Sequence, residues 1–174
     1  MKVLVVYESM FGNTATVARA IAEGCSDAGA LVALHHVSEV DPHTVDDYDL
    51  VVAGAPTHAW SLPRPSSREE AVRQGAPAAS GTGLREWIAE VDPRVGARPA
   101  FAVFDSRIGT GTARHFTGSA ARRAARDLRA RHRVLAEDPA SFFVEGASGP
   151  LLPGEVVRAH AWGSRLARSA PVGS

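Results

Sequence analysis

A short polar loop near the start of the chain is the first stretch whose residue types could do chemistry. Residues 8–13 (ESMFGN) are rich in small and hydroxyl-bearing side chains and follow an apolar, β-branched run at 3–7. After the loop, apolar residues recur at helical spacing on one face: Val17, Ile21, Cys25 and Ala28. A strand, a tight loop and a helix in this order direct backbone N–H groups and the positive helix end to one point. The pattern predicts an anion site, and phosphate is the anion that fits it best.

Two further polar loops follow apolar runs. Residues 49–55 (DLVVAGA) are apolar on both faces, as in a central parallel strand, and they end at the loop 56–63 (PTHAWSLP). Residues 99–104 (PAFAVF) form another buried strand, which runs into a Gly- and Thr-rich loop over 105–118. Ligands of parallel α/β sheets bind outside the carboxyl ends of the strands, so we expect the three loops to meet there. The sequence predicts one small site at this edge.

The remaining elements complete an alternation of strands and helices. A second strand is expected at 31–36, and a broken fifth strand at 134–135 and 141–144. Helices are expected over 84–91, 119–133 and 155–168, with a short capped helix at 66–73 inside an irregular excursion, 64–83. This alternation predicts a three-layer, doubly wound α/β fold with a five-stranded parallel sheet and right-handed crossovers. We expect one domain over 1–168 and a disordered tail over 169–174.

Composition favours an ordinary globular protein and excludes several classes. The 174 residues are 45% hydrophobic, and their nineteen basic and nineteen acidic side chains cancel, so neither nucleic acid nor a membrane is an expected partner. Cys25 is the one cysteine, which excludes an internal disulfide framework, and its inward helical position predicts a buried thiol. The histidines lack metal-ligand spacing. With no signal-peptide pattern and no membrane-length apolar run, we expect a cytoplasmic protein.

The three loops together resemble those of the flavodoxin family, and the resemblance spans residues 2–168. Residues 7–14 (YESMFGNT) are similar to the loop that holds the phosphate of FMN. Residues 54–60 (GAPTHAW) resemble the loop that covers one face of the isoalloxazine ring, and 104–107 (FDSR) resemble the loop on the other side. The resemblance implies a flavodoxin-like sheet with strand order 2-1-3-4-5 and noncovalent FMN.

The resemblance also assigns cofactor-binding roles to residues of these loops. The phosphate would be held by two hydroxyls and a run of amides, from Ser9, Met10, Phe11, Gly12, Asn13 and Thr14, with Thr14 opening the helix. The ring would lie against Pro56, Thr57, His58, Ala59 and Trp60. Its pyrimidine edge would be approached by Asp105, Ser106 and Arg107. No residue is assigned as a catalytic acid or base.

Some of these residues could have structural roles instead of binding a cofactor. Ser9 and Asn13 could simply cap the helix, and Trp60 could pack into a core. Phe11 stands where flavodoxins commonly have a hydroxyl, which weakens the expected hold on the phosphate. The presumed site carries few carboxylates but several arginines: Arg64, Arg68, Arg107 and Arg114.

The favoured function is electron transfer, with a redox partner protein or a small-molecule electron donor or acceptor, by a monomer or homo-oligomer. The first alternative is an FMN-dependent NAD(P)H:quinone reductase, in which the loops and the 64–83 excursion would shape a substrate pocket. The second is a binding module that has lost the flavin. The helix at 119–133 carries six arginines, which could dock an acidic partner or form a solvated face.

Overall fold

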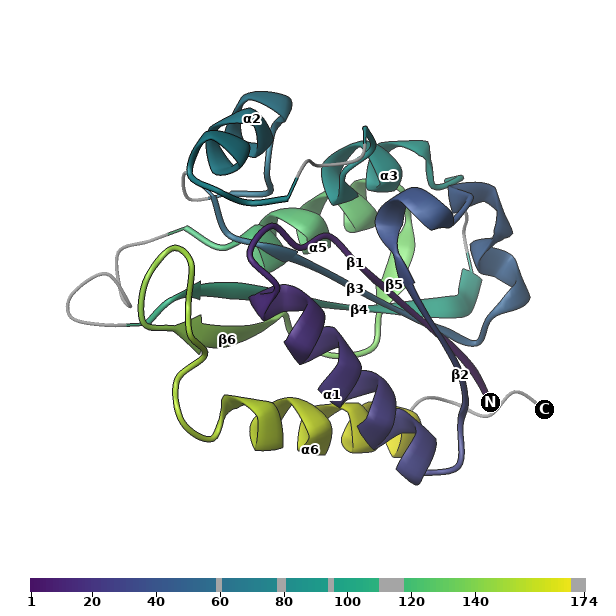
Figure 1. The fold of residues 1–174 in the computed structure, drawn as a ribbon. Helices are drawn as coiled ribbons and strands as arrows, with labels where there is room; N and C mark the ends of the chain where they lie inside the picture. Colours follow the sequence, from purple (N-terminus) through teal and green to yellow (C-terminus); the bar gives the residue numbers. More distant parts are fainter. Residues whose placement is uncertain (59–60, 78–80, 94–95, 110–117, 170–174) are drawn as a thin grey trace.

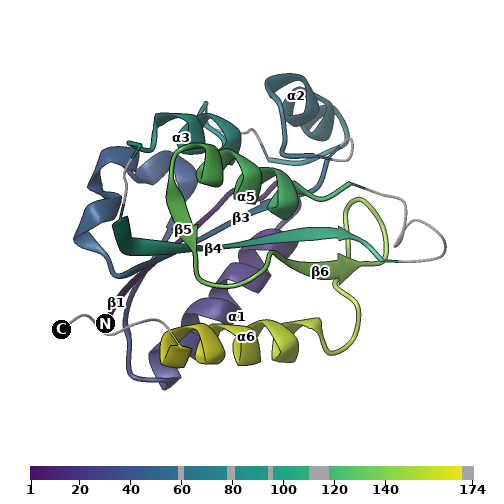
Figure 2. The ribbon, with the colours of Figure 1, turned by 180° about the vertical axis from the view of Figure 1, so that it is seen from behind.

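The computed structural model describes residues 1–58, 61–77, 81–93, 96–109 and 118–169 and arranges them in three layers. A central sheet lies between two groups of helices (Figure 1). Helices α1 (Asn13–Asp27) and α6 (Glu155–Ser169) cover one face, and α3 (Leu84–Glu90) and α5 (Ala120–Ala130) cover the other. The reverse view shows α5 over β4 and β5 (Figure 2).

The sheet has the predicted strand order. Its main path is β2-β1-β3-β4-β5, formed by β2 (Leu31–His36), β1 (Lys2–Tyr7), β3 (Leu50–Pro56), β4 (Gly96–Ile108) and β5 (Arg133–Leu135). All of these pairs are parallel. A further strand, β6 (Ala140–Val144), pairs with the carboxyl half of β4. The broken fifth strand of the prediction is therefore two short strands on one side of β4, and the doubly wound fold class is confirmed.

Several boundaries differ from the prediction. The fourth strand was expected to end at Phe104, but it continues to Ile108 because β6 supplies backbone partners for residues 104–108. The arginine-rich helix was expected to reach Arg133, but it stops at Ala130; His132 takes a left-handed φ of 60°, and Arg133 begins β5. Helix α6 extends to Ser169, the first residue of the expected tail; residues 170–174 lie outside the described part.

The connections are short helical turns. Between β2 and β3 the chain forms the 3-10 helices η1 (Val37–Glu39) and η2 (Pro42–Asp47). The excursion after β3 contains α2 (Pro65–Arg73), which stands apart from the main helical layers beyond the edge of the sheet (Figure 1).

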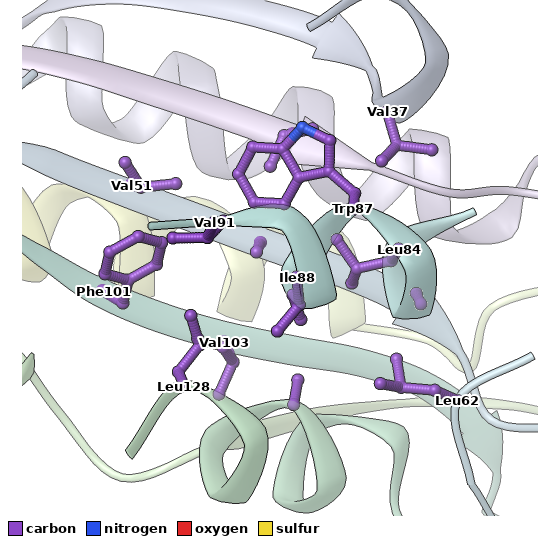
Figure 3. Packing of buried hydrophobic residues seen from close by; sticks show 14 of the residues in the cluster. Val37, Val51, Leu62, Leu84, Trp87, Ile88, Val91, Phe101, Val103 and Leu128 are labelled. Atoms are coloured by element: carbon purple, nitrogen blue, oxygen red, sulfur yellow. The ribbon is translucent and has the colours of Figure 1, made fainter. Parts of the chain in front are cut away.

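Two hydrophobic cores hold the layers together. On one face, Trp87 and Ile88 of α3 pack toward Val103 of β4 and Leu128 of α5 (Figure 3). On the other face, edge-to-face contacts join three large rings, those of Phe104, Phe142 and Trp162. Burying such aromatic side chains contributes on the order of 2–3 kcal/mol each. The cores fix the strands, and thereby the edge at which their loops meet.

Helices α1 and α6 approach each other through glycines. A Cβ on Gly163 would lie 2.2 Å from the backbone oxygen of Ile21, and one on Gly24 would lie 2.0 Å from the backbone oxygen of His160. The Cys25 thiol is buried at this interface and donates to the Gly163 carbonyl at 3.2 Å, as a core thiol does. Burial raises its pKa to about 11.

Candidate functional site

The first loop presents a row of backbone N–H groups. Gly12 has φ 86° and ψ −13°, a left-handed conformation that favours glycine, and α1 begins immediately after it at Asn13. Thr14, predicted to open the helix, is its second residue. Within the described part of the chain, the amides of residues 10–14 donate no hydrogen bond, whereas the next turn is closed by Thr16 N–H to Gly12 O at 3.0 Å. Free amides at a helix N-terminus are the donors that an anion requires.

The side chains of this loop divide their roles. The Ser9 Oγ accepts a hydrogen bond from the Ala15 amide at 3.3 Å, so this hydroxyl does cap the helix. Asn13 does not cap: its Nδ2 donates to the carbonyl of Ser148 at 3.0 Å and ties the loop after β6 to α1. The Thr14 hydroxyl lies 2.7 Å from that of Ser106, which joins the first loop to β4.

Phe11 has a packing role. Its ring lies against a small cluster formed by Met10 of the same loop and Ala71 and Ala76 of the excursion. The aromatic ring at this position therefore attaches the loop to the α2 segment instead of supplying a hydroxyl.

Thr57 anchors the second loop instead of simply facing a ligand. Its hydroxyl donates to Asp105 Oδ2 at 3.0 Å and accepts from the Ala120 amide at 2.9 Å, while its own amide donates to the Ser106 carbonyl at 2.8 Å. The first residues after β3 are thus fixed to β4 and to the start of α5.

The side chain of Asp105 points in a different direction from the one predicted. Its side chain is fully buried and points to the N-terminus of α5, where Oδ2 also accepts from Ser119 Oγ at 2.5 Å and from the Ala121 amide at 3.1 Å. The reason is strand alternation: residue 105 is still part of β4, so its side chain faces α5 while that of Ser106 faces α1. The expectation that the Asp105 side chain reaches the pyrimidine edge of a flavin is not met by this geometry.

A cavity of about 220 Å³ opens where the loops meet. Its walls come from all three predicted loops and from a fourth segment, with lining residues Met10, Phe11, Asn13, Thr14, Pro56, Thr57, His58, Ser106, Arg107, Ile108, Val144 and Ala147. Ser9 and Gly12 belong to the first loop without lining the cavity. The predicted residues Ala59 and Trp60 lie outside the described residues.

The fourth wall was not predicted. Ile108, Val144 and Ala147 come from the ends of β4 and β6 and from the following loop. The signal was present, since the run at 141–144 was read as a strand, and its carboxyl end must reach the same edge as that of β4.

His58 is a titratable side chain of the cavity, and its surroundings shift its pKa. Burial lowers the pKa of His58 below its ordinary value, and the charge of Glu8 opposes that shift in part. Its backbone is held by paired hydrogen bonds with Ser61, each 3.0 Å long. The site therefore favours a neutral imidazole near neutral pH.

A buried ion pair lies behind the first loop. Glu8 Oε1 accepts from Arg68 Nε at 2.7 Å, Glu8 Oε2 accepts from the Leu84 amide at 2.8 Å, and Arg68 also pairs with Glu86. A second cavity, of about 370 Å³, adjoins this pair and shares Met10 with the first. Of the arginines expected around the site, Arg107 lines the first cavity, Arg68 is committed to carboxylates, Arg64 is exposed, and Arg114 lies outside the described residues.

Other kinds of site are not indicated by these residues. In the described ranges, no cluster of three or more His, Cys, Asp or Glu side chains could hold a metal ion. Among the described helices, none has the length and apolarity that crossing a membrane requires.

Comparisons with known proteins converge on one fold family. The flavodoxin family model matches residues 5–74, which contain the first two loops. The fold of flavodoxin 1 from Bacillus cereus superposes with a TM-score of 0.70 at 16% identity, covering 97% of this chain and 98% of that one. The chain is flavodoxin-like. A flavodoxin from the domain Archaea gives a TM-score of 0.64 at 18% identity and covers 98% of this chain and 99% of that one.

Curated relatives of another name match a shorter stretch of this flavodoxin-like chain. An NAD(P)H dehydrogenase (quinone) of Acidovorax ebreus (strain TPSY) is 33% identical over 82 residues, which covers 36% of this chain and 41% of that protein. One from Rhizobium meliloti (strain 1021) is 36% identical over 81 residues, covering 35% and 38%. The chain spans about two fifths of the length of the curated relatives it matches.

FMN is the cofactor that the sequence resemblance implies, and the residues present fit its groups. The amides beside Gly12, which donate to no acceptor among the described residues, suit a phosphate. The cavity next to them combines apolar walls with a few polar groups, among them Ser106 and His58, as sites for planar cofactors do.

Proposed function

We propose that this chain binds FMN noncovalently in the 220 Å³ cavity and transfers electrons through it. The observation that carries the proposal is the row of free amides at residues 10–14, next to a cavity at the carboxyl edge of the sheet. A row of unpaired donors is costly in a protein unless water or a ligand accepts from it, and a phosphate accepts several of them at once.

In this proposal the amides of the first loop bind the phosphate, and the hydroxyls of Thr14 and Ser106 are the next polar groups along the cavity wall. Residues 56–58, held by Thr57, and the apolar side chains of Ile108 and Val144 enclose the ring and exclude water from its faces. The flavin supplies the redox chemistry when bound, and the protein sets its orientation and the exposure of its edge.

His58 has a role of its own. A neutral imidazole in the cavity can accept or donate one hydrogen bond without adding a charge beside the ring. Arg107, one of the predicted pyrimidine contacts, lies at the cavity wall, and its charge favours an anionic form of the ring. The cytoplasmic location expected from the sequence stays a prediction.

The second candidate function is FMN-dependent quinone reduction with NAD(P)H as the electron donor. It is favoured by the relatives named NAD(P)H dehydrogenase (quinone), whose similarity covers about a third of this chain and less than half of their own length. In this case the cavity behind Met10 and the α2 excursion would shape a substrate pocket.

The decisive first experiment is to titrate the purified, flavin-free protein with FMN. Binding is monitored through the quenching of flavin fluorescence. We expect saturable binding at one FMN per chain, with riboflavin, which lacks the phosphate, binding at least tenfold more weakly. Equal affinity for FMN and riboflavin would contradict the phosphate role of the first loop. No uptake of either would support a binding module without flavin.

The second experiment separates the two functions. The FMN-loaded protein is mixed with NADPH and a quinone, without any added reductase. An electron carrier is expected to oxidise NADPH no faster than free FMN does. Rapid quinone-dependent oxidation would assign the chain to the reductase function instead.

A further inference from the structure

We propose that the outer face of α5 and the groove between α3 and α5 form a docking surface for an acidic redox protein. This surface, the arginine face, consists of Arg85, Arg122, Arg123, Arg126, Arg129 and Arg131. The inference rests on the proposed electron-transfer function. The partner is a protein with a carboxylate-rich patch beside its own redox centre.

Three arginines of α5 project into solvent. Arg122, Arg126 and Arg129 recur at spacings of four and three, so they lie on one helical face, and all three are exposed. Among the residues that the structure describes, none of them makes an ion pair. Unpaired like charges along one helix face repel each other and weaken the isolated helix, so a structural role does not account for them.

The groove beside them has an apolar floor and a cationic rim. It encloses about 500 Å³ and is lined by Arg85, Ile88, Ala89, Pro93, Arg123, Asp127, Ala130 and Arg131. Its one acidic lining residue, Asp127, is held by Arg123 at 2.8 Å. Burial, together with the nearby charges of Arg123 and Arg64, lowers the pKa of Arg85, which agrees with a positive potential in the groove.

The arginine face adjoins the proposed flavin site. The guanidinium of Arg85 donates to the backbone carbonyls of Leu62, at 2.6 Å, and Pro63, at 3.2 Å, at the end of the second loop. The first residue of α5, Ala120, donates its amide to Thr57 in the cavity wall. A protein seated on α5 therefore rests against the elements that hold the ring loop.

The opposite face of the molecule is organised differently. On α6, Arg158 pairs with Glu155, and Arg165 pairs with Glu137 across 3.1 Å. Arg19 of α1 and Arg168 of α6 are also exposed, but they lie on different helices, whereas the three exposed arginines of α5 form one row of positive charge. Complementary patches of this kind steer a partner and orient it during encounter.

The proposed step moves one electron. The reduced partner is oxidised by one electron and the flavin gains that electron, with no bond formed or broken in either protein. The arginine face contributes orientation and attraction to this step, and no protein group takes part in the chemistry.

The test measures how fast an acidic plant-type ferredoxin, in its reduced form, reduces the FMN-loaded protein by stopped flow at several salt concentrations. The charge-reversal variant is Arg122→Glu with Arg126→Glu. Its matched control is Arg19→Glu with Arg168→Glu, two exposed arginines on the α1 and α6 side that give the same change in net charge. Flavin content and reduction by an uncharged deazaflavin photoreductant check that each variant is folded and loaded.

We expect the α5 variant to react at least about tenfold more slowly than wild type at low salt, and the control within about twofold. Near 1 M salt, where the screening length is about 3 Å, the proteins should converge. Equal slowing by both pairs, or a wild-type rate independent of salt, would overturn the docking surface. Failure of the wild type to hold FMN would instead overturn the proposed function. In that case, calorimetric titration with ferredoxin would still show whether the arginine face binds ferredoxin. The pair Arg126→Glu with Arg129→Glu repeats the test if the first variant loses flavin.

Discussion

Replacing Gly12 by alanine tests the phosphate loop most directly. Gly12 has φ 86°, and a Cβ there would meet no atom within 4 Å, so the cost of alanine comes from the backbone alone. A left-handed conformation costs a non-glycine residue about 1–2 kcal/mol. Gly29, with φ 90° and equally open space, is the matched control at the other end of α1.

The two positions differ in what holds them. The amides of Gly29 and Ala30 donate to the carbonyls of Ser26 and Cys25, at 2.9 and 3.1 Å, so the conformation is fixed whether or not FMN is bound. Among the described residues, the amides of the loop at Gly12 have no protein acceptors, so in the free protein the loop can relax away from the strained conformation. Binding of FMN must then restore that conformation.

The same strain should therefore appear in different measurements. We expect Gly12→Ala to weaken FMN binding by about 5- to 30-fold, which corresponds to 1–2 kcal/mol at 1.4 kcal/mol per factor of ten. Gly29→Ala should leave the FMN affinity unchanged and lower the free energy of unfolding by about 1–2 kcal/mol. Fluorescence titration gives the affinities and urea denaturation the stabilities. If both variants bind FMN equally well, the first loop does not hold the phosphate in the way proposed.

Three further predictions concern stability and protonation. Burial raises the pKa of Cys25 from 9.0 to about 11, so the stabilising contribution of its thiol is present below pH 9 and lost toward pH 11. Urea denaturation should therefore show wild type losing stability relative to Cys25→Ala across that range. Parallel stability curves for the two proteins would contradict this prediction. Burial lowers the pKa of His58, so its ring should titrate below pH 6.5 in an NMR titration. Wild type should also lose stability relative to His58→Gln as the pH falls through that range. A titration midpoint above 6.5 would show that the imidazole is not buried. Gly163→Ala places a Cβ 2.2 Å from a backbone oxygen of α1 and should destabilise by about 1–3 kcal/mol in thermal unfolding, whereas Gly81→Ala, in open space, should have little effect.

Much of the site's position could be predicted from local patterns. The runs at 3–7 and 49–55 were read as buried strands because their apolar residues are continuous, and a loop that follows such a strand must lie at the edge of the sheet. The helical spacing after the first loop placed its amides at a helix N-terminus. These are properties of neighbouring residues, so they are visible without the fold.

Side-chain direction at the third loop could not be predicted in the same way. Asp105 was assigned to a loop because the apolar run ends at Phe104, yet β6, thirty-five residues further on, keeps the chain extended as far as Ile108. Once residue 105 belongs to a strand, its side chain must face α5, and its carboxylate joins Thr57 to the start of that helix. Only a nonlocal pairing contains this information.

The sequence by itself thus determined the order of strands and helices and the edge of the sheet that carries the loops, and it predicts that the first loop binds a phosphate. Each of these depends on residue types and spacing within about fifteen positions. The tertiary structure decided which polar groups face the cavity, that the loop after β6 forms its fourth wall, and that Arg68 reaches Glu8 across sixty residues. Those outcomes depend on which segments pack together, because a side chain's partners are set by burial and strand pairing and not by its neighbours along the chain.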